Sequence, residues 1–131
     1  MGTAEKWQDR VVKMLNDTNV IILNPRRDDW DWTWEQSINN PKFKEQVEWE
    51  LDNILHSDIV LVYFDKNAKS PITLLELGLI SEQELGYIKD VIVVCPEGFW
   101  RKGNVDIICE IYGHTVKNTL EEAVEEIRRK I

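Results

Sequence analysis

Residues 47–78 read VEWELDNILHSDIVLVYFDKNAKSPITLLELG. In order, they contain a segment of mixed polar and apolar residues, a wholly apolar run, and a second segment rich in apolar residues. The first segment has apolar side chains at helical spacing, which predicts a helix over about residues 42–57. Residues 59–64 are apolar throughout, as expected of a parallel strand covered on both faces. The Ser-Pro pair that follows opens a helix over about residues 70–86, because serine is a preferred N-cap and proline is favoured at the first helical position.

The same alternation extends in both directions along the chain. Upstream, the spacing predicts an amphipathic helix over residues 3–16 and a buried strand over residues 20–23. Downstream, it predicts a strand over residues 91–95 and a charged terminal helix over residues 119–130. Helices that alternate with apolar strands predict an α/β fold, with a doubly wound, mainly parallel sheet flanked by helices. Such sheets bind ligands beyond the carboxyl ends of their strands.

Composition limits the classes of function. The chain has 131 residues, of which 43% are hydrophobic, so we expect one domain over residues 1–131. A net charge of -8 argues against nucleic-acid polymers as partners, because a phosphate backbone would be repelled. The apolar runs are too short to cross a bilayer and the N-terminus lacks a secretory pattern, so we expect a cytoplasmic protein outside the membrane. The two cysteines and two histidines show no metal-ligand spacing, and no metal or other cofactor is expected.

Glu76 is a carboxylate within an otherwise apolar helical segment. Its neighbours at helical spacing are all aliphatic: Ile72, Leu75, Leu79 and Ile80. Burial of a carboxylate costs free energy and raises its pKa, and catalytic carboxylates are often found in such surroundings. The spacing fits a partly exposed glutamate near the positive end of the helix equally well.

The preceding helix carries the carboxylates Glu48, Glu50 and Asp52. Most carboxylates on helices are solvated surface groups. The order of the elements nevertheless sends this helix and the helix of Glu76 to the same region of the fold, so two carboxylates can converge on one pocket. Paired carboxylates are the usual means of cleaving a glycosidic bond.

Two loops carry polar and aromatic side chains suited to a ligand. In the loop after the first predicted strand, Trp30 and Trp32 either stack on a planar base or cover the edge of the sheet. Arg26, beside them, is placed to bind either a phosphate or a carboxylate of its own loop. Residues 99–109 form a polar segment after a strand, which contacts either ligand or a neighbouring subunit.

Four segments together resemble the nucleoside 2-deoxyribosyltransferase-like family. They are NPRRDDWDW at 24–32, VEWELDNILHSDIVLVYF at 47–64, SPITLLELG at 70–78 and GFWRKGNVDI at 98–107. The resemblance implies a flavodoxin-like fold and a nucleoside or nucleoside monophosphate as the small-molecule partner. In this family the glutamate of the E-L-G motif, here Glu76, attacks the anomeric carbon and forms a covalent glycosyl-enzyme. The sugar then passes to another base or to water.

The resemblance also assigns roles to other residues of this sequence. Glu50 matches the assisting carboxylate by its spacing to Asp58, with Asp52 as the reserve candidate. In the family, the residue six before the nucleophile lies near the 5′ end of the sugar and is aspartate in transferases but serine in nucleotide hydrolases. In this sequence it is Ser70. In the family, an asparagine after a later strand reaches the site of a neighbouring subunit, and Asn104 is the candidate for that role here. The resemblance therefore implies a homo-oligomer. The substrate-binding residues expected from the segments and the resemblance are Ser70, Asn24, Arg26, Trp30, Trp32 and Asn104.

One departure from the family concerns the first strand. Members open with a central strand of the F-L-A-G-S-I kind, whereas this sequence begins directly with the helix predicted over residues 3–16. Loss of a central strand leaves the ladder groups of its neighbours unpaired. We expect that the sheet rearranges, that another chain supplies the edge, or that Met1 is internal to a longer protein.

Three functions follow from these observations. The first is an enzyme that cleaves N-glycosidic bonds, with Glu76 as nucleophile. The second is a catalytically impaired nucleoside- or nucleotide-binding module with a regulatory role, which the absent strand favours and the retained glutamate disfavours. The third is a flavodoxin-like protein that holds a flavin.

Overall fold

The computed structural model describes residues 6–25, 33–82 and 88–131. Three strands, β1 (Ile59–Tyr63), β2 (Asp90–Val94) and β3 (Thr115–Lys117), form a parallel sheet in the order β1-β2-β3. The helices in these ranges are α1 (Trp7–Met14), α2 (Pro41–Leu55), α3 (Pro71–Ser81), α4 (Lys102–Tyr112) and α5 (Leu120–Lys130). The parallel sheet and its helices confirm the predicted α/β, flavodoxin-like architecture.

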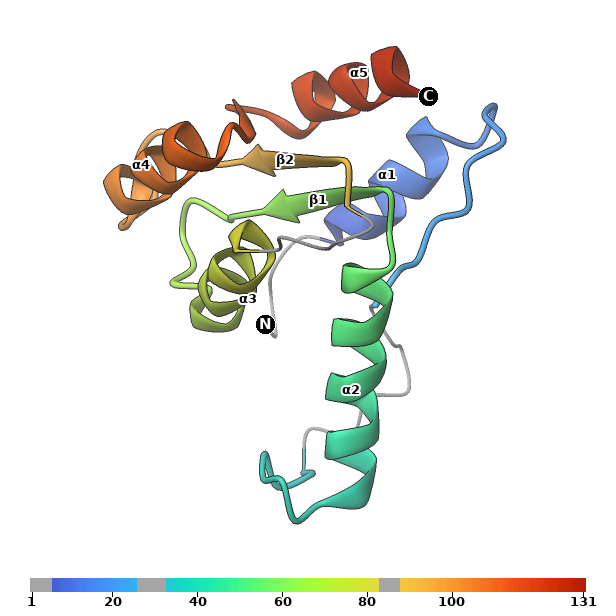
Figure 1. Cartoon of the computed structure of the whole chain (residues 1–131), viewed down its shortest axis with the longest axis vertical. Coiled ribbons are helices and arrows are strands. Elements are labelled where there is room, and N and C mark those ends of the chain that lie inside the picture. The colour runs from blue at the N-terminus through green and yellow to red at the C-terminus, as the bar shows by residue number, and fades with distance from the viewer. Residues whose placement is uncertain (1–5, 26–32, 83–87) are drawn as a thin grey trace.

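The sheet separates two layers of helices, as a doubly wound fold requires. Successive side chains of a strand point to opposite faces. In β2, Ile92 and Val94 pack with α1 and α5, whereas Val91 and Val93 pack with α3 and α4. Figure 1 shows the helices arranged around the strands, with α2 projecting away from the sheet. Phe64, fully buried after β1, lies 4.7 Å from Phe99 between ring centroids and joins the ends of β1 and β2.

Helix α2 begins at an effective cap. The Asn40 side chain accepts hydrogen bonds from the backbone N–H groups of Lys42 and Phe43, and Pro41 occupies the first helical position. Little of this helix is covered, and Gln46 is its buried residue. Because α2 leads directly into β1, its last turns lie beside the sheet while its first turns extend away (Figure 1).

Strand β1 forms one edge of the sheet. Val60 and Val62 are buried, whereas Ile59, Leu61 and Tyr63 are half-buried. The prediction that every strand is covered on both faces is therefore correct for β2 and wrong for β1. An edge strand has less of the sheet and fewer helices around it.

The strand predicted over residues 20–23 is not formed. These residues have no regular structure, and the side chain of Ile21 is 89% exposed. In the flavodoxin-like strand order 2-1-3-4-5, the second strand pairs only with the first. In that order the first strand would lie in the sheet between residues 20–23 and β1. No segment in the described ranges forms that strand, so residues 20–23 lack a ladder partner there.

Several element ends differ from the prediction. Helix α1 is described from Trp7, and the expected cap Thr3 lies outside the described residues. Helix α3 ends at Ser81 rather than near residue 86. Helix α5 begins where predicted, and the Thr119 side chain caps it by accepting the N–H of Glu122.

The sequence did not predict α4 and β3. The buried residues of α4, Val105 and Cys109, are spaced four apart, which is a helical signal. Gly113 ends α4 in the left-handed conformation, with a φ of 72°. Strand β3 is too short for periodicity to predict. None of the helices in the described ranges is long and apolar enough to span a bilayer.

Candidate active site

Two glutamates from different helices form an electrostatically coupled pair. Glu50 lies in α2, which precedes β1, and Glu76 lies in α3, which follows it. Both side chains are half-buried. Burial, followed by the negative charge of Glu50, raises the pKa of Glu76 to about 7. The structure therefore brings together the two carboxylates that the sequence singled out.

The carboxylate of Glu50 is held by a buried amide. Burial raises the pKa of Glu50, and a hydrogen bond from Gln46 opposes that rise. The Nε2 atom of Gln46 donates to Oε1 of Glu50 at 3.0 Å and to the carbonyl of Pro25 at 3.4 Å. Gln46 thus links Glu50 to the segment that contains Asn24, which is half-buried and has no regular structure.

The other carboxylates of α2 face solvent. Glu48 forms an ion pair with Lys44, and the side chain of Asp52 is 75% exposed and lies 3.3 Å from Nδ1 of His56. Exposed pairs spaced four apart on a helix contribute little free energy. Of the two candidates for the partner of Glu76, the structure therefore favours Glu50 over the reserve, Asp52.

Ser70 occupies the N-cap position of α3 in an unusual conformation. Its φ of 51° lies in the left-handed region, which is uncommon for a residue other than glycine, and its side chain makes no capping hydrogen bond. Pro71 follows and has no N–H to satisfy. The Ser70 hydroxyl is therefore not used in capping α3.

Trp100 joins the loop after β2 to the start of α3. Its Nε1–H donates to the carbonyl of Lys69 at 2.9 Å. Two cations lie over its ring: Nζ of Lys69 is 5.4 Å and Cζ of Arg101 is 4.3 Å from the ring centroid. Cations attracted to the face of a tryptophan stabilise such an arrangement. This contact fixes the backbone immediately before Ser70.

Four predicted site residues remain. Asn104 is exposed in the first turn of α4, one residue before the buried Val105. Arg26, Trp30 and Trp32 lie outside the described residues.

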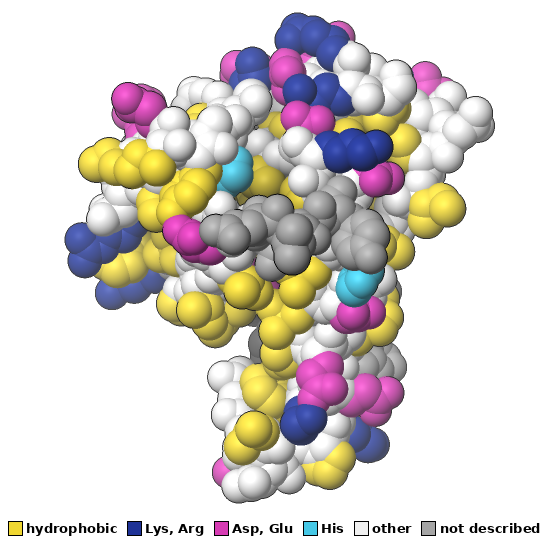
Figure 2. All heavy atoms as spheres, in the orientation of Figure 1, with side chains coloured by type: hydrophobic (Ala, Val, Ile, Leu, Met, Phe, Trp, Pro, Cys, Tyr) yellow, Lys and Arg dark blue, Asp and Glu magenta, His cyan; other side chains and the backbone are white. Residues whose placement is uncertain are grey.

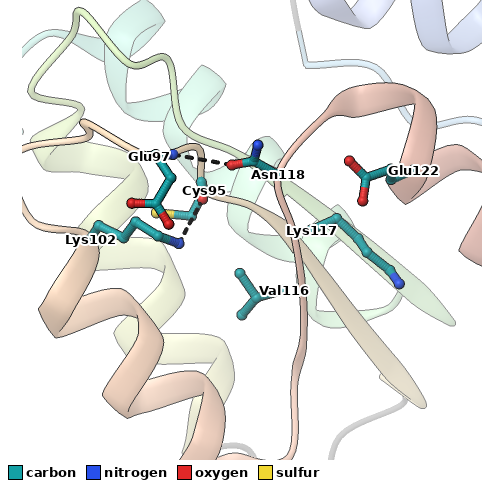
Figure 3. A pocket seen from close by; sticks show the side chains of 7 residues that line it. All are labelled: Cys95, Glu97, Lys102, Val116, Lys117, Asn118 and Glu122. Carbon is teal, nitrogen blue, oxygen red and sulfur yellow. Dashed lines mark hydrogen bonds between the residues drawn. The ribbon is translucent and has the colours of Figure 1, made fainter.

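Among the residues that the structure describes, two of the cavities lie at the carboxyl ends of the strands, and neither of these two is lined by Glu76 or Glu50. The larger, of about 380 Å³, is shown in Figure 3 and is lined by Cys95, Glu97, Lys102, Val116, Lys117, Asn118 and Glu122. The other has a volume of about 280 Å³ and lies near the end of β1. Several polar groups in the larger cavity bind one another. The Glu97 N–H donates to Asn118 at 3.1 Å, and Lys102 donates to the Cys95 carbonyl at 3.0 Å.

The buried thiol in the larger cavity is not a reactive group. Burial raises the pKa of Cys95 to about 11, and the nearby ammonium of Lys102 offsets only part of that rise. A thiol with such a pKa is almost wholly protonated at neutral pH and is a poor nucleophile.

The family model described as nucleoside 2-deoxyribosyltransferase like matches residues 1–99. This chain belongs to that family. The match includes α1, α2, β1, α3 and β2, and hence both glutamates. A search among curated proteins finds no match.

Two residues near the family motifs were missed by sequence reasoning. Gln46 lies four residues before Glu50, a spacing that places both on one face of α2. This spacing was the one sequence signal that the two side chains can meet. A glutamine on a helix is otherwise expected at the surface. Trp100 lies within the family segment at residues 98–107, but its contact with Lys69 depends on the tertiary fold.

The raised pKa of Glu76 predicts how stability depends on pH. The folded protein binds this proton more tightly than the unfolded chain, where the pKa is near 4.5. The resulting stabilisation is present at low pH and is lost as the pH rises through about 7. Glu76→Gln cannot ionise, so the variant should gain stability relative to wild type between about pH 5 and about pH 8.

Urea unfolding of both proteins across that range measures the difference. Glu48→Gln is the matched control, because Glu48 is exposed and paired with Lys44, and it should retain the wild-type pH dependence. A constant difference between wild type and Glu76→Gln at every pH would contradict the raised pKa.

Proposed function

We propose that this protein cleaves the N-glycosidic bond of 2′-deoxynucleosides or their monophosphates and transfers the deoxyribosyl group to another base or to water. The observation that carries the proposal is the coupling of Glu76 and Glu50, two half-buried carboxylates from the helices on either side of β1. Family membership supports a nucleoside-type ligand. A cytoplasmic location fits this role and is part of the proposal.

The reaction proceeds in two displacements at C1′. An oxygen of the ionised Glu76 forms a bond to C1′ as the C1′–N bond breaks, and the electron pair leaves with the base. Glu50 in its acid form gives a proton to the departing base. In the second step the acceptor nitrogen or water attacks C1′, its proton passes to Glu50, and Glu76 leaves as a carboxylate.

The pKa of Glu76 sets a condition on the first step. Only the ionised carboxylate attacks, and the ionised fraction grows as the pH rises through about 7. The half-buried position that raises the pKa also removes water from the carboxylate, so that the ionised group is a stronger nucleophile.

Other residues hold the substrate. Ser70, six residues before Glu76, contributes a hydroxyl that capping does not use, and it binds the 5′ end of the sugar as a hydroxyl or a phosphate. Asn24 lies next to Pro25, whose carbonyl is held by Gln46, and this places it near Glu50. Arg26, Trp30 and Trp32 continue the same segment and contact the base.

A homo-oligomer completes the site in this proposal. Along α3, Ile72, Leu75 and Leu79 are exposed, and the side chain of Leu75 is 69% exposed. Along α4, Ile107 and Ile111 are exposed, with 60% for Ile107. Figure 2 shows hydrophobic side chains gathered on the side of the molecule where these two helices lie. A second copy that covers this surface would meet Asn104 of α4.

A second candidate is a nucleoside- or nucleotide-binding module without turnover. The observation that favours it is the irregular, exposed segment at residues 20–23, next to the expected base-binding loop. This segment would border the base pocket, and its irregular backbone would make that pocket less ordered than the part of the site that holds the two glutamates. Such a module would gain thermal stability from the ligand but release no base.

The first prediction from this proposal concerns base release. Wild-type protein should release free base from 2′-deoxynucleosides or their monophosphates, measured by chromatography with and without an acceptor base. Glu76→Ala should lower the rate by about a thousandfold or more, because the nucleophile is lost. Glu50→Gln should lower it by about a hundredfold or more, because the proton donor is lost.

Asp52→Asn is the matched control on the same helix. Asp52 is exposed, so this variant should retain the wild-type rate. No base release from folded wild-type protein across the whole substrate panel would reject the enzyme, and ligand-induced thermal stabilisation would then support the binding module.

The second prediction concerns assembly. Leu75→Glu and Ile107→Glu place a charge on the exposed apolar surface of α3 and α4, and each should shift the protein to a smaller species in sedimentation velocity. Ile38→Glu changes an exposed isoleucine outside both helices and should leave the assembly intact. A wild-type protein that sediments as a monomer at all concentrations would contradict the homo-oligomer.

A further inference from the structure

Gln46 is a buried residue near the middle of α2, a helix whose other residues are half-buried or exposed. Its side chain is 5% exposed, and it is the buried residue of α2. A buried amide costs free energy unless its N–H groups find acceptors. Nε2 has two N–H groups, and it lies 3.0 Å from the Glu50 carboxylate and 3.4 Å from the Pro25 carbonyl. The amide therefore joins one oxygen of Glu50 to a backbone segment 21 residues away in sequence.

The chemistry of the contact favours one state of Glu50. An N–H donor stabilises an ionised carboxylate more than a neutral acid, and this hydrogen bond opposes the effect of burial on the pKa of Glu50. The charge of Glu50 in turn raises the pKa of Glu76 on α3. Glu48 and Asp52 on the same helix are exposed, with Lys44 and His56 as their respective partners.

We infer that Gln46 is a positioning residue for the proposed reaction, which holds Glu50 in a fixed orientation beside Glu76 and fastens the base-binding segment at Pro25 to the same amide. The inference rests on the proposed function for its catalytic consequence, while the effect on Glu50 stands on the contacts alone. Gln46 binds one oxygen of Glu50, and in the proposed site the substrate contacts the other. The same amide thereby links the position of the base-binding segment at Pro25 to the position of Glu50, which exchanges a proton with the base.

The amide also acts on the ionisation of Glu50. With Gln46 present, Glu50 keeps its charge more readily, and the charged form is the one that accepts a proton in the second displacement. Without the donor, Glu50 takes a proton at a higher pH.

Titration of the glutamate side chains by NMR tests the inference directly. Full-length protein with ¹³C-labelled glutamate carboxyl groups is titrated as wild type and as Gln46→Met, with Glu50→Gln and Glu76→Gln to assign the signals. Because a hydrogen bond to a charged group is lost, the pKa of Glu50 should rise by about one unit or more in Gln46→Met. The rate of base release should fall by about tenfold, with a smaller change in KM, because the orientation of Glu50 matters most in the transition state.

Asn53→Ala is the matched control on α2. Its amide donates to the Trp49 carbonyl of its own helix at 2.8 Å, so this variant should leave the titration of Glu50 unchanged. Gln46→Asn keeps a polar amide but shortens its reach, and it should raise the pKa of Glu50 as Gln46→Met does, even if the methionine variant does not fold.

The outcomes separate this inference from the proposed function. An unchanged pKa of Glu50 in a folded Gln46 variant would overturn the positioning role. A raised pKa in the variants, together with no base release from wild type, would support the contact between Gln46 and Glu50 and reject the enzyme.

Discussion

Repulsion between two half-buried carboxylates is the constraint on which the candidate site depends. Burial raises the pKa of both glutamates, and the charge of Glu50 adds to the cost of ionising Glu76. A fold that only needed stability would place aliphatic side chains there, as in the rest of α3. This cost falls where a glutamate of the helix before β1 interacts with a glutamate of the helix after it. Strain or unfavourable charge confined to one place is typical of functional sites.

The sheet explains why this pair forms although part of the expected fold is not seen. Strand β1 pairs in parallel with β2 over its whole length, from Ile59 opposite Asp90 to Tyr63 opposite Val94. That pairing fixes both ends of β1, and thereby the end of α2 and the start of α3. The outer edge of β1 has no such support within the described ranges. The carboxylate pair therefore depends on the better-packed half of the sheet, while the base-binding side depends on the other half.

The sequence predicted the elements whose signals are local. Residues 59–64 are apolar without interruption, Thr119 is followed by a charged amphipathic helix, and Glu76 interrupts an aliphatic helix; each is readable without tertiary information. The failure at residues 20–23 has the opposite cause, because a strand needs a partner and the apolar run contains no information about one. The same limit applies to Gln46, whose burial depends on Pro25, and to the choice between Glu50 and Asp52, which differ in exposure rather than in type.

In the proposed reaction Glu76 carries the sugar, whereas a glutamate with a pKa of about 7 also suits a proton donor. A 2′-deoxy-2′-fluoronucleoside slows both displacements, because fluorine destabilises positive charge at C1′, and so it allows the covalent intermediate to accumulate. Mass spectrometry of the intact protein and then of its peptides locates the adduct. We expect one fluorodeoxyribosyl group on Glu76. An adduct on Glu50, or turnover of substrate with no adduct on any glutamate, would contradict it.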